Sequence, residues 1–483
     1  MDVANLMGLL PLIVIAATAV AVLLSAAVRR HHLAAAVMTV VGLSGAVVTV
    51  PLAATVVPRQ ITPLLIVDGY GLFYMALLIA ASMLVAILAY GYLQGREGNL
   101  EEFYVLLLLA TLGAVVLALG NHFASLFLGL ELLSVALYAL IAYLRTRARP
   151  LEAALKYLIL AAASAAFLLF GLALVYAELG TMEFGRMAML LATADNIRTA
   201  LVFTGLAMTI TGIGFKLAVV PFHMWTPDVY EGAPAPVTAF VATVSKGAIV
   251  ALLLRYVVQT GTYPYGSLLL TFSVMAGASM VVGNLLALLQ DNVKRILAYS
   301  SIAHLGYLLV ALVAGGPRGV EAATYYLVAY MLTTLSAFGS VIVLSEKEQD
   351  AENVAAYRGL FWRRPWLAMA FTAALLSLAG IPVTAGFVGK FYVLLTGVES
   401  ALWPLIFLLV FGSAVGLFYY LRLVVAMYAP GPEAPDLHLT RPEPSLSFAT
   451  ILTLTILTIG VLWLGLFPVP LIHTIRLTVA SLL

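Results

Sequence analysis

The chain has 483 residues, of which 63% are hydrophobic and only 10% are charged, and its net charge at pH 7 is +2. Soluble domains carry about 25% charged residues, so this composition excludes a soluble globular protein and indicates a membrane protein. The small net charge gives no reason to expect a nucleic-acid partner. Cysteine is absent, which excludes disulfides, iron–sulfur clusters and thiolate metal sites. We therefore expect no metal site and no redox centre in this chain.

Apolar runs of the length that a bilayer core requires, roughly 20 residues, recur between short polar connectors. The first run follows Asp2 and lacks the basic segment of a signal peptide, so we expect a retained helix. The fold class is therefore all-α and polytopic, with about fourteen transmembrane helices. We predict these spans at 7–28, 33–56, 69–94, 103–119, 122–144, 151–178, 199–226, 236–260, 266–289, 296–314, 321–345, 366–396, 402–429 and 446–473.

The distribution of lysine and arginine predicts the orientation of these spans. If both termini face outward, the inner connectors hold thirteen of these residues: Arg29, Arg30, Arg96, Arg145, Arg147, Arg149, Lys294, Arg295, Lys347, Arg358, Arg363, Arg364 and Arg441. The outer connectors hold five, namely Arg59, Arg186, Arg198, Arg318 and Arg476. We expect a multi-pass membrane protein with both termini on the periplasmic or outer side. The polar stretches at 346–364 and 430–445 have the length of loops rather than domains.

Four ionisable residues stand out inside the predicted spans: Glu131, Lys216, Lys246 and Lys390. Each costs roughly 3 kcal/mol at a helix centre, and such residues commonly mark ion or proton pathways. Burial disfavours the charged form of a lysine, whereas a nearby carboxylate favours it, so a lysine between these influences can load and release a proton. Glu131 is the only carboxylate deep in a span and is the natural partner. A static ion pair that joins two helices is the alternative.

Two of the lysines lie beside interruptions of their spans, one in each half of the chain. Lys216 precedes Pro221, and Lys390 follows Gly380 and Pro382. Proline removes a backbone donor and frees carbonyl groups, which a bilayer tolerates only where they line protein or water. A plain proline kink explains one such site, but a kink beside a buried lysine in both halves favours an ion path.

Other polar residues in the spans are weaker candidates for a relay. Lys156 follows Glu152 by four positions, so an interfacial ion pair explains it as well as a relay does. His223 and His304 are secondary relay candidates because histidine titrates near neutrality. Arg255 and Arg422 lie within reach of helix ends, and for them we favour packing or lipid contact.

Several long motifs resemble the antiporter-like subunits of bacterial respiratory complex I, the NADH:quinone oxidoreductase. They are NHFASLFLGLELLS at 121–134, PFHMWTPDVYEGAP at 221–234, KRILAYSSIAH at 294–304 and GIPVTAGFVGK at 380–390. The resemblance covers nearly the whole chain and is weakest in the first three spans and the last. Two features resemble those of the N type within that group. One is the lysine at position 246, and the other is a length that leaves no room for a long lateral C-terminal helix.

The resemblance implies two inverted five-helix repeats, each with one broken helix. Its four parts are an N-terminal three-helix segment at 1–95, a first half-channel repeat at 103–260 with its break near 199–226, a second at 266–429 with its break near 366–396, and a C-terminal helix at 446–483. It also implies that no redox group lies here, with flavin, iron–sulfur clusters and quinone on other subunits. The implied partners are protons, the lipid bilayer and sister membrane subunits.

The resemblance further implies a role for each buried ionisable residue. Glu131 would pair with Lys216 and set its proton affinity, Lys246 would be the central relay, and Lys390 would pass the proton outward. A cation/proton antiporter subunit, either Mrp-type or hydrogenase-linked, shares this pattern and is the alternative function. A membrane scaffold with static charges is a third interpretation.

Overall fold

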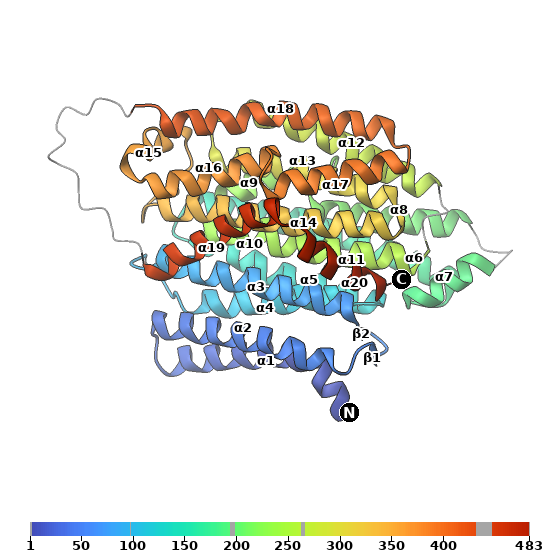
Figure 1. The fold of residues 1–483 in the computed structure, drawn as a ribbon. Coiled ribbons are helices and arrows are strands. Elements are labelled where there is room, and N and C mark those ends of the chain that lie inside the picture. Colours follow the sequence, from blue (N-terminus) through green and yellow to red (C-terminus); the bar gives the residue numbers. More distant parts are fainter. Residues whose placement is uncertain (1, 97, 194–198, 262–265, 431–446, 483) are drawn as a thin grey trace.

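The computed structural model describes residues 2–96, 98–193, 199–261, 266–430 and 447–482 of the chain. These residues form a bundle in which most of the long helices lie roughly along one common axis (Figure 1). The first half contains α1 (Val3–Val28), α2 (His32–Ala54), α3 (Gly69–Leu93), α4 (Glu102–Leu119), α5 (Phe123–Ile141), α6 (Ala148–Leu179), α7 (Phe184–Thr193), α8 (Thr199–Leu217), α9 (Trp225–Gly232), α10 (Ala235–Phe240), the π-helix η1 (Val241–Ser245) and α11 (Lys246–Gln259). The second half contains α12 (Gly266–Leu288), α13 (Val293–Ala314), α14 (Gly316–Leu344), the 3-10 helix η2 (Val354–Tyr357), α15 (Leu360–Arg363), α16 (Pro365–Ala379), α17 (Ala385–Glu399), α18 (Trp403–Tyr428), α19 (Phe448–Leu466) and α20 (Val469–Ala480).

Thirteen helices in the described part of the chain are long and apolar enough to cross a membrane. The successive helices α16 and α17 make up the remaining predicted span, the one near 366–396. The expected all-α polytopic membrane fold is therefore confirmed. The inverted relation between two five-helix repeats stays a prediction.

Both interrupted segments are broken in the structure. Helix α8 ends at Leu217 and α9 begins at Trp225, so Pro221 lies in the gap between them. Helix α16 ends at Ala379, and Gly380 and Pro382 lie in the gap before α17. Each gap holds a non-glycine residue in the left-handed region, Ala218 at φ 61° and Val383 at φ 77°. Such conformations cost about 1–3 kcal/mol and persist only where the surrounding structure enforces them.

The structure shows three local features that the predicted spans do not include. The span predicted at 236–260 contains the π-helix η1 directly before Lys246, a local feature that hydrophobic periodicity does not reveal. The last span ends at Leu466, and a new helix follows Pro468, which cannot donate the hydrogen bond that would continue α19. The connector after α2 forms an antiparallel hairpin of β1 (Arg59–Thr62) and β2 (Leu65–Val67).

Both termini lie at the same end of the bundle, as the orientation argument requires (Figure 1). Two of the arginines in that argument, Arg198 and Arg441, lie outside the described residues, as does most of the polar stretch at 430–445. The centre of the bundle is formed by the helices from α10 to α11, by α13 and by α14, whose membrane-spanning windows are 100%, 94% and 83% buried. These central elements carry Lys246 and His304 and therefore hold them away from lipid.

Candidate functional site

Lys246 lies at the centre of a buried network of hydroxyl groups. Its side chain is fully buried, and its Nζ donates to Ser301 Oγ at 2.5 Å. The same Ser301 oxygen is 2.6 Å from the Tyr330 hydroxyl and 3.4 Å from that of Tyr230. Lys246 is the first residue after the π-helix η1, and such bulges are frequent at functional sites because they re-aim the following side chains.

His304, also on α13, lies in a second set of hydrogen bonds beside the first. Its Nδ1 is 2.7 Å from the Tyr326 hydroxyl, and its Nε2 is 3.2 Å from the Tyr420 hydroxyl, which also contacts Ser300. The centre of the His304 ring lies 5.6 Å from that of Tyr330 and 5.5 Å from that of Tyr307. The two nitrogens of His304 therefore bridge hydroxyl groups on α14 and α18, and its ring contacts Tyr330, a partner of Ser301.

Lys390 contacts backbone rather than a side-chain acceptor. Its Nζ donates to the Ala379 carbonyl at 3.0 Å, across the gap between α17 and α16, and lies 5.2 Å from the centre of the Tyr307 ring. The carbonyl groups of the last helical turn lack intrahelical partners and carry partial negative charge. A Cβ atom at Gly380 would come within 2.8 Å of Lys390 Cδ, so the glycine leaves room for this contact.

Lys216 lies in the last turn of α8 and reaches α5. Its Nζ donates to Ser134 Oγ at 2.7 Å, and Ser134 in turn donates to the Leu130 carbonyl at 2.6 Å. Glu131 lies one turn away from Ser134 on α5. Glu131 and Lys216 make no ion pair, and the buried Oε1 of Glu131 has no hydrogen-bond partner among the described residues. The direct contact implied by the resemblance is replaced by the Ser134 hydroxyl, which sequence reasoning missed.

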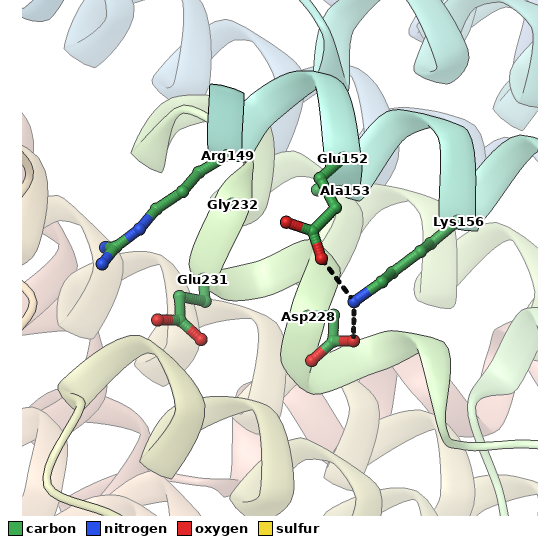
Figure 2. A pocket seen from close by; sticks show the side chains of 7 residues that line it. All are labelled: Arg149, Glu152, Ala153, Lys156, Asp228, Glu231 and Gly232. Atoms are coloured by element: carbon green, nitrogen blue, oxygen red, sulfur yellow. Dashed lines mark hydrogen bonds and ion pairs between the residues drawn. The ribbon is translucent and has the colours of Figure 1, made fainter. Parts of the chain in front are cut away.

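Lys156 lies at the surface in a small charged hollow of about 130 Å³ (Figure 2). Its Nζ is 2.8 Å from both Glu152 Oε1 and Asp228 Oδ2, and its side chain is 45% exposed. Figure 2 shows Lys156 and Glu152 on α6, facing Asp228 on α9. The predicted pair with Glu152 is present, and Asp228 is an additional partner from the other side of the hollow.

The remaining predicted positions lie outside the lysine network. His223 is half-buried in the gap before α9, and its buried Nδ1 has no partner among the described atoms. Pro221 and Pro382 are on the outside of the bundle. A second hollow of about 470 Å³ lies at the end that carries the termini, opposite the hollow of Lys156, and is lined by Arg318, Glu321, Tyr392, Leu395, Thr396, Glu399 and Arg476.

Two cations are buried more deeply than the sequence indicated. Of packing and lipid contact, Arg255 shows packing, since it is fully buried in a bidentate ion pair with Asp68 at 2.7 and 2.8 Å. Its helix is apolar all round, which indicated a central position where snorkelling is impossible. Lys294, expected in a connector, is fully buried and lies 2.8 Å from Asp350. Arg422 does lie near its helix end, where it is paired with Asp291.

Comparison with known proteins identifies the group to which this arrangement belongs. Residues 120–416, more than half of the chain, match the family described as NADH:quinone oxidoreductase/Mrp antiporter, transmembrane. The chain belongs to this family. It is 52% identical over 453 residues to the NADH-quinone oxidoreductase subunit N of Nitrosospira multiformis, covering 91% of this chain and 89% of that protein.

Solved structures show the same fold. A chain of respiratory complex I from Thermus thermophilus with bound aureothin is 34% identical, with a TM-score of 0.81 and coverage of 96% of this chain and 98% of that chain. A chain of the archaeal membrane-bound sulfane sulfur reductase, at 24% identity and TM-score 0.87, and one of the Mrp complex from Dietzia, at 19% and 0.86, share the fold; each comparison covers 100% of this chain and 98% of the other.

Proposed function

We propose that this chain is a proton-translocating, antiporter-like subunit N of an NADH:quinone oxidoreductase, in which Lys216, Lys246 and Lys390 carry the proton. Glu131 acts on Lys216, and His304 with its tyrosine partners joins Lys246 to Lys390. The 52% identity to a subunit of that name supports the assignment to complex I. The 19% identity to a chain of an Mrp complex supports only a shared fold.

The observation that carries the proposal is the kind of partner that each buried cation has. Lys216 and Lys246 donate to serine hydroxyls and Lys390 to a carbonyl, and no carboxylate forms an ion pair with any of the three in the described structure. A buried ammonium that no carboxylate contacts directly is costly to keep charged, which makes it suited to releasing a proton.

Buried cations with a structural role in this chain look different. Arg255 is held by Asp68, and Lys294 by Asp350, each through contacts of 2.7–2.8 Å. The scaffold interpretation requires such fixed pairs at the three relay lysines as well. Their absence there, together with the chain of hydroxyl groups around Ser301, favours proton transfer over static packing.

The proposal includes a location and partners. The chain would lie in a bacterial plasma membrane, with both termini on the periplasmic side and among sister membrane subunits, as expected for a relative of chains from complex I. Flavin, iron–sulfur clusters and quinone would belong to other subunits of the assembly. Energy from quinone reduction would therefore reach the lysines through protein contacts rather than through a redox group in this chain.

NADH-driven proton pumping by inverted membrane vesicles carrying Lys246→Met tests the proposal. Methionine matches the size of lysine and cannot bind a proton, so we expect pumping to fall at least about tenfold while the complex still assembles. Assembly is followed on native gels, and Lys347→Met serves as the control because Lys347 is exposed and lies in a loop. Normal pumping by an assembled Lys246→Met complex would contradict the proposal and favour the scaffold interpretation.

A further inference from the structure

A second buried polar network lies near the end of the bundle opposite the termini, and the proposed relay does not use it. Lys294, at the start of α13, is fully buried and donates at 2.8 Å to three oxygens: the Glu231 carbonyl, the Ala233 carbonyl and Asp350 Oδ2. Two of these acceptors belong to the end of α9 and the third to the loop that follows α14. One ammonium group therefore joins the two halves of the chain.

The backbone acceptors of Lys294 belong to the broken helix of the first half. Glu231 is in the last turn of α9 and Ala233 is its cap, so their carbonyls are among those that a helix end leaves without partners. A cation at this position is favoured by the partial negative charge of the helix end. Helix α10, η1 and Lys246 follow directly along the chain. Lys294 thus holds the segment that leads into the central relay lysine.

Asp350 is itself held firmly in place. The Tyr92 hydroxyl donates to Asp350 Oδ1 at 2.7 Å, and Arg96 Nη2 lies 3.8 Å from the same carboxylate. The loop that carries it is joined to the start of α13, where the Val293 amide donates to the Glu352 carbonyl at 2.5 Å. The carboxylate therefore links α3, the loop after α14 and α13.

Helix α13 contacts the α9–α11 segment at two points of one face. Lys294 holds the end of α9, and Ser301, seven positions later, accepts from Lys246. Residues seven apart lie on the same side of a helix, separated by about 10 Å along its axis. Displacement of α9 along α13 would therefore also change the geometry between Lys246 and Ser301.

We propose that Lys294 and Asp350 form a positioning pair that fixes the broken helix of the first half against α13 and so keeps Lys246 aligned with Ser301. This inference rests on the proposed function, since it concerns the alignment of the relay. Neither residue exchanges the transported proton. Their role is to transmit the position of the loop after α14 to Lys246. Variants of the pair should therefore weaken the coupling between NADH oxidation and proton pumping while the relay lysines themselves remain in place.

The test is the ratio of protons pumped to NADH oxidised in inverted vesicles, with assembly measured in parallel. We expect Asp350→Asn and Lys294→Met to lower this ratio by about fivefold, within the range known for residues that couple distant sites. Lys294→Arg keeps the charge and several donors and should retain more than about half of the ratio. A purely structural role would lower assembly and leave the ratio of the assembled complex unchanged.

A milder variant keeps the test decisive if the charge variants fail to assemble. Tyr92→Phe removes only one hydrogen bond to Asp350 and should lower the ratio about twofold. The matched control is Arg149→Gln, which breaks the exposed ion pair between Arg149 and Glu352 in the same loop and should leave the ratio unchanged. A normal ratio in the assembled Tyr92→Phe complex would overturn the inference, whether or not the charge variants assemble.

The double variant Lys294→Met/Asp350→Asn tests whether the two residues act as a unit. Because each loses its partner in either single variant, the double variant should be no worse than the more severe single one. Multiplied losses would show independent roles and overturn the pair. Lys246→Met separates the two proposals: if it abolishes pumping while the Asp350 and Tyr92 variants pump normally, only the positioning inference fails.

Discussion

Lys216 lies just before one helix break and Lys390 lies after the other, and the two lysines are stabilised by different means. Lys216 donates to a serine hydroxyl, with Glu131 one turn away on the same helix as that serine. Lys390 donates to the carbonyl at the end of α16, and no carboxylate pairs with it in the described structure. A serine hydroxyl and a nearby carboxyl side chain surround Lys216, whereas a carbonyl at a helix end, with its partial negative charge, holds Lys390. The two halves therefore surround their lysines with different chemical groups.

The largest expected effect comes from removing either lysine. Lys216→Met and Lys390→Met should each lower pumping at least about tenfold, because both halves contribute one obligatory group to a single path. Pumping by vesicles, normalised to assembled complex, measures this. Near-normal pumping in one variant and loss in the other would show that only one half carries the proton.

Gly380→Ala tests the backbone contribution in the second half. Gly380 has φ 83°, and an added Cβ would meet the side chain of Lys390, so we expect pumping to fall about fivefold as the lysine loses the Ala379 carbonyl. Gly180→Ala is the matched control, since Gly180 has φ 65° but nothing within 4 Å of an added Cβ. Equal losses in both variants would assign the effect to backbone strain alone.

Glu131→Gln tests the carboxyl side chain near Lys216 in the first half. The amide preserves the shape of the side chain but removes its charge, so we expect a loss of pumping of about threefold to tenfold through Lys216. The control is Glu399→Gln, which removes an exposed carboxylate from the second half and should have no effect. A normal pumping rate for Glu131→Gln would mean that Ser134 alone sets the environment of Lys216.

Ser134→Ala removes the acceptor of Lys216 while leaving Glu131 in place. We expect a smaller loss of pumping, about twofold to threefold, together with lower thermal stability, because a buried donor without a partner costs about 1–3 kcal/mol. The melting temperature of the purified complex and the pumping rate are the two measurements. A larger effect than that of Glu131→Gln would reverse the order of importance assigned to the hydroxyl and the carboxylate.

The smallest expected effect is the pH dependence of the stability that the Lys294–Asp350 pair contributes. Burial alone would raise the pKa of Asp350, but the charge of Lys294 and the hydrogen bonds from Lys294 and Tyr92 lower it below its ordinary value. A lowered pKa means that the stabilisation by Asp350 is complete above the ordinary carboxyl pKa of about 3.9 and is lost as pH falls through the lower folded value. The stability difference between wild type and Asp350→Asn should therefore stay constant from about pH 8 to pH 5. A difference that varied over this interval would contradict the assignment.

The sequence identified those ionisable residues whose free energy of insertion into a membrane span is high. Glu131, Lys216, Lys246 and Lys390 stand out because each interrupts an apolar run, and Pro221 and Gly380 because they end helices by local sterics. Cations near predicted span ends gave no such signal. Lys294 was assigned to a connector and Arg255 to packing or lipid contact near a helix end, and both are fully buried in ion pairs. Their partners, Asp350 and Asp68, come from distant loops, which periodicity cannot locate.

The sequence by itself determined the membrane environment, the succession of spans and the position of the two breaks, since hydrophobic length and proline act over a few neighbouring residues. Tertiary structure alone decided which acceptor each buried cation received. Ser134 rather than Glu131 accepts from Lys216, and Ser301 accepts from Lys246 after a π-helix that no local pattern announces. Hydrogen bonds form over about 3 Å, so they depend on helix packing across many intervening residues rather than on the order of residues along the chain.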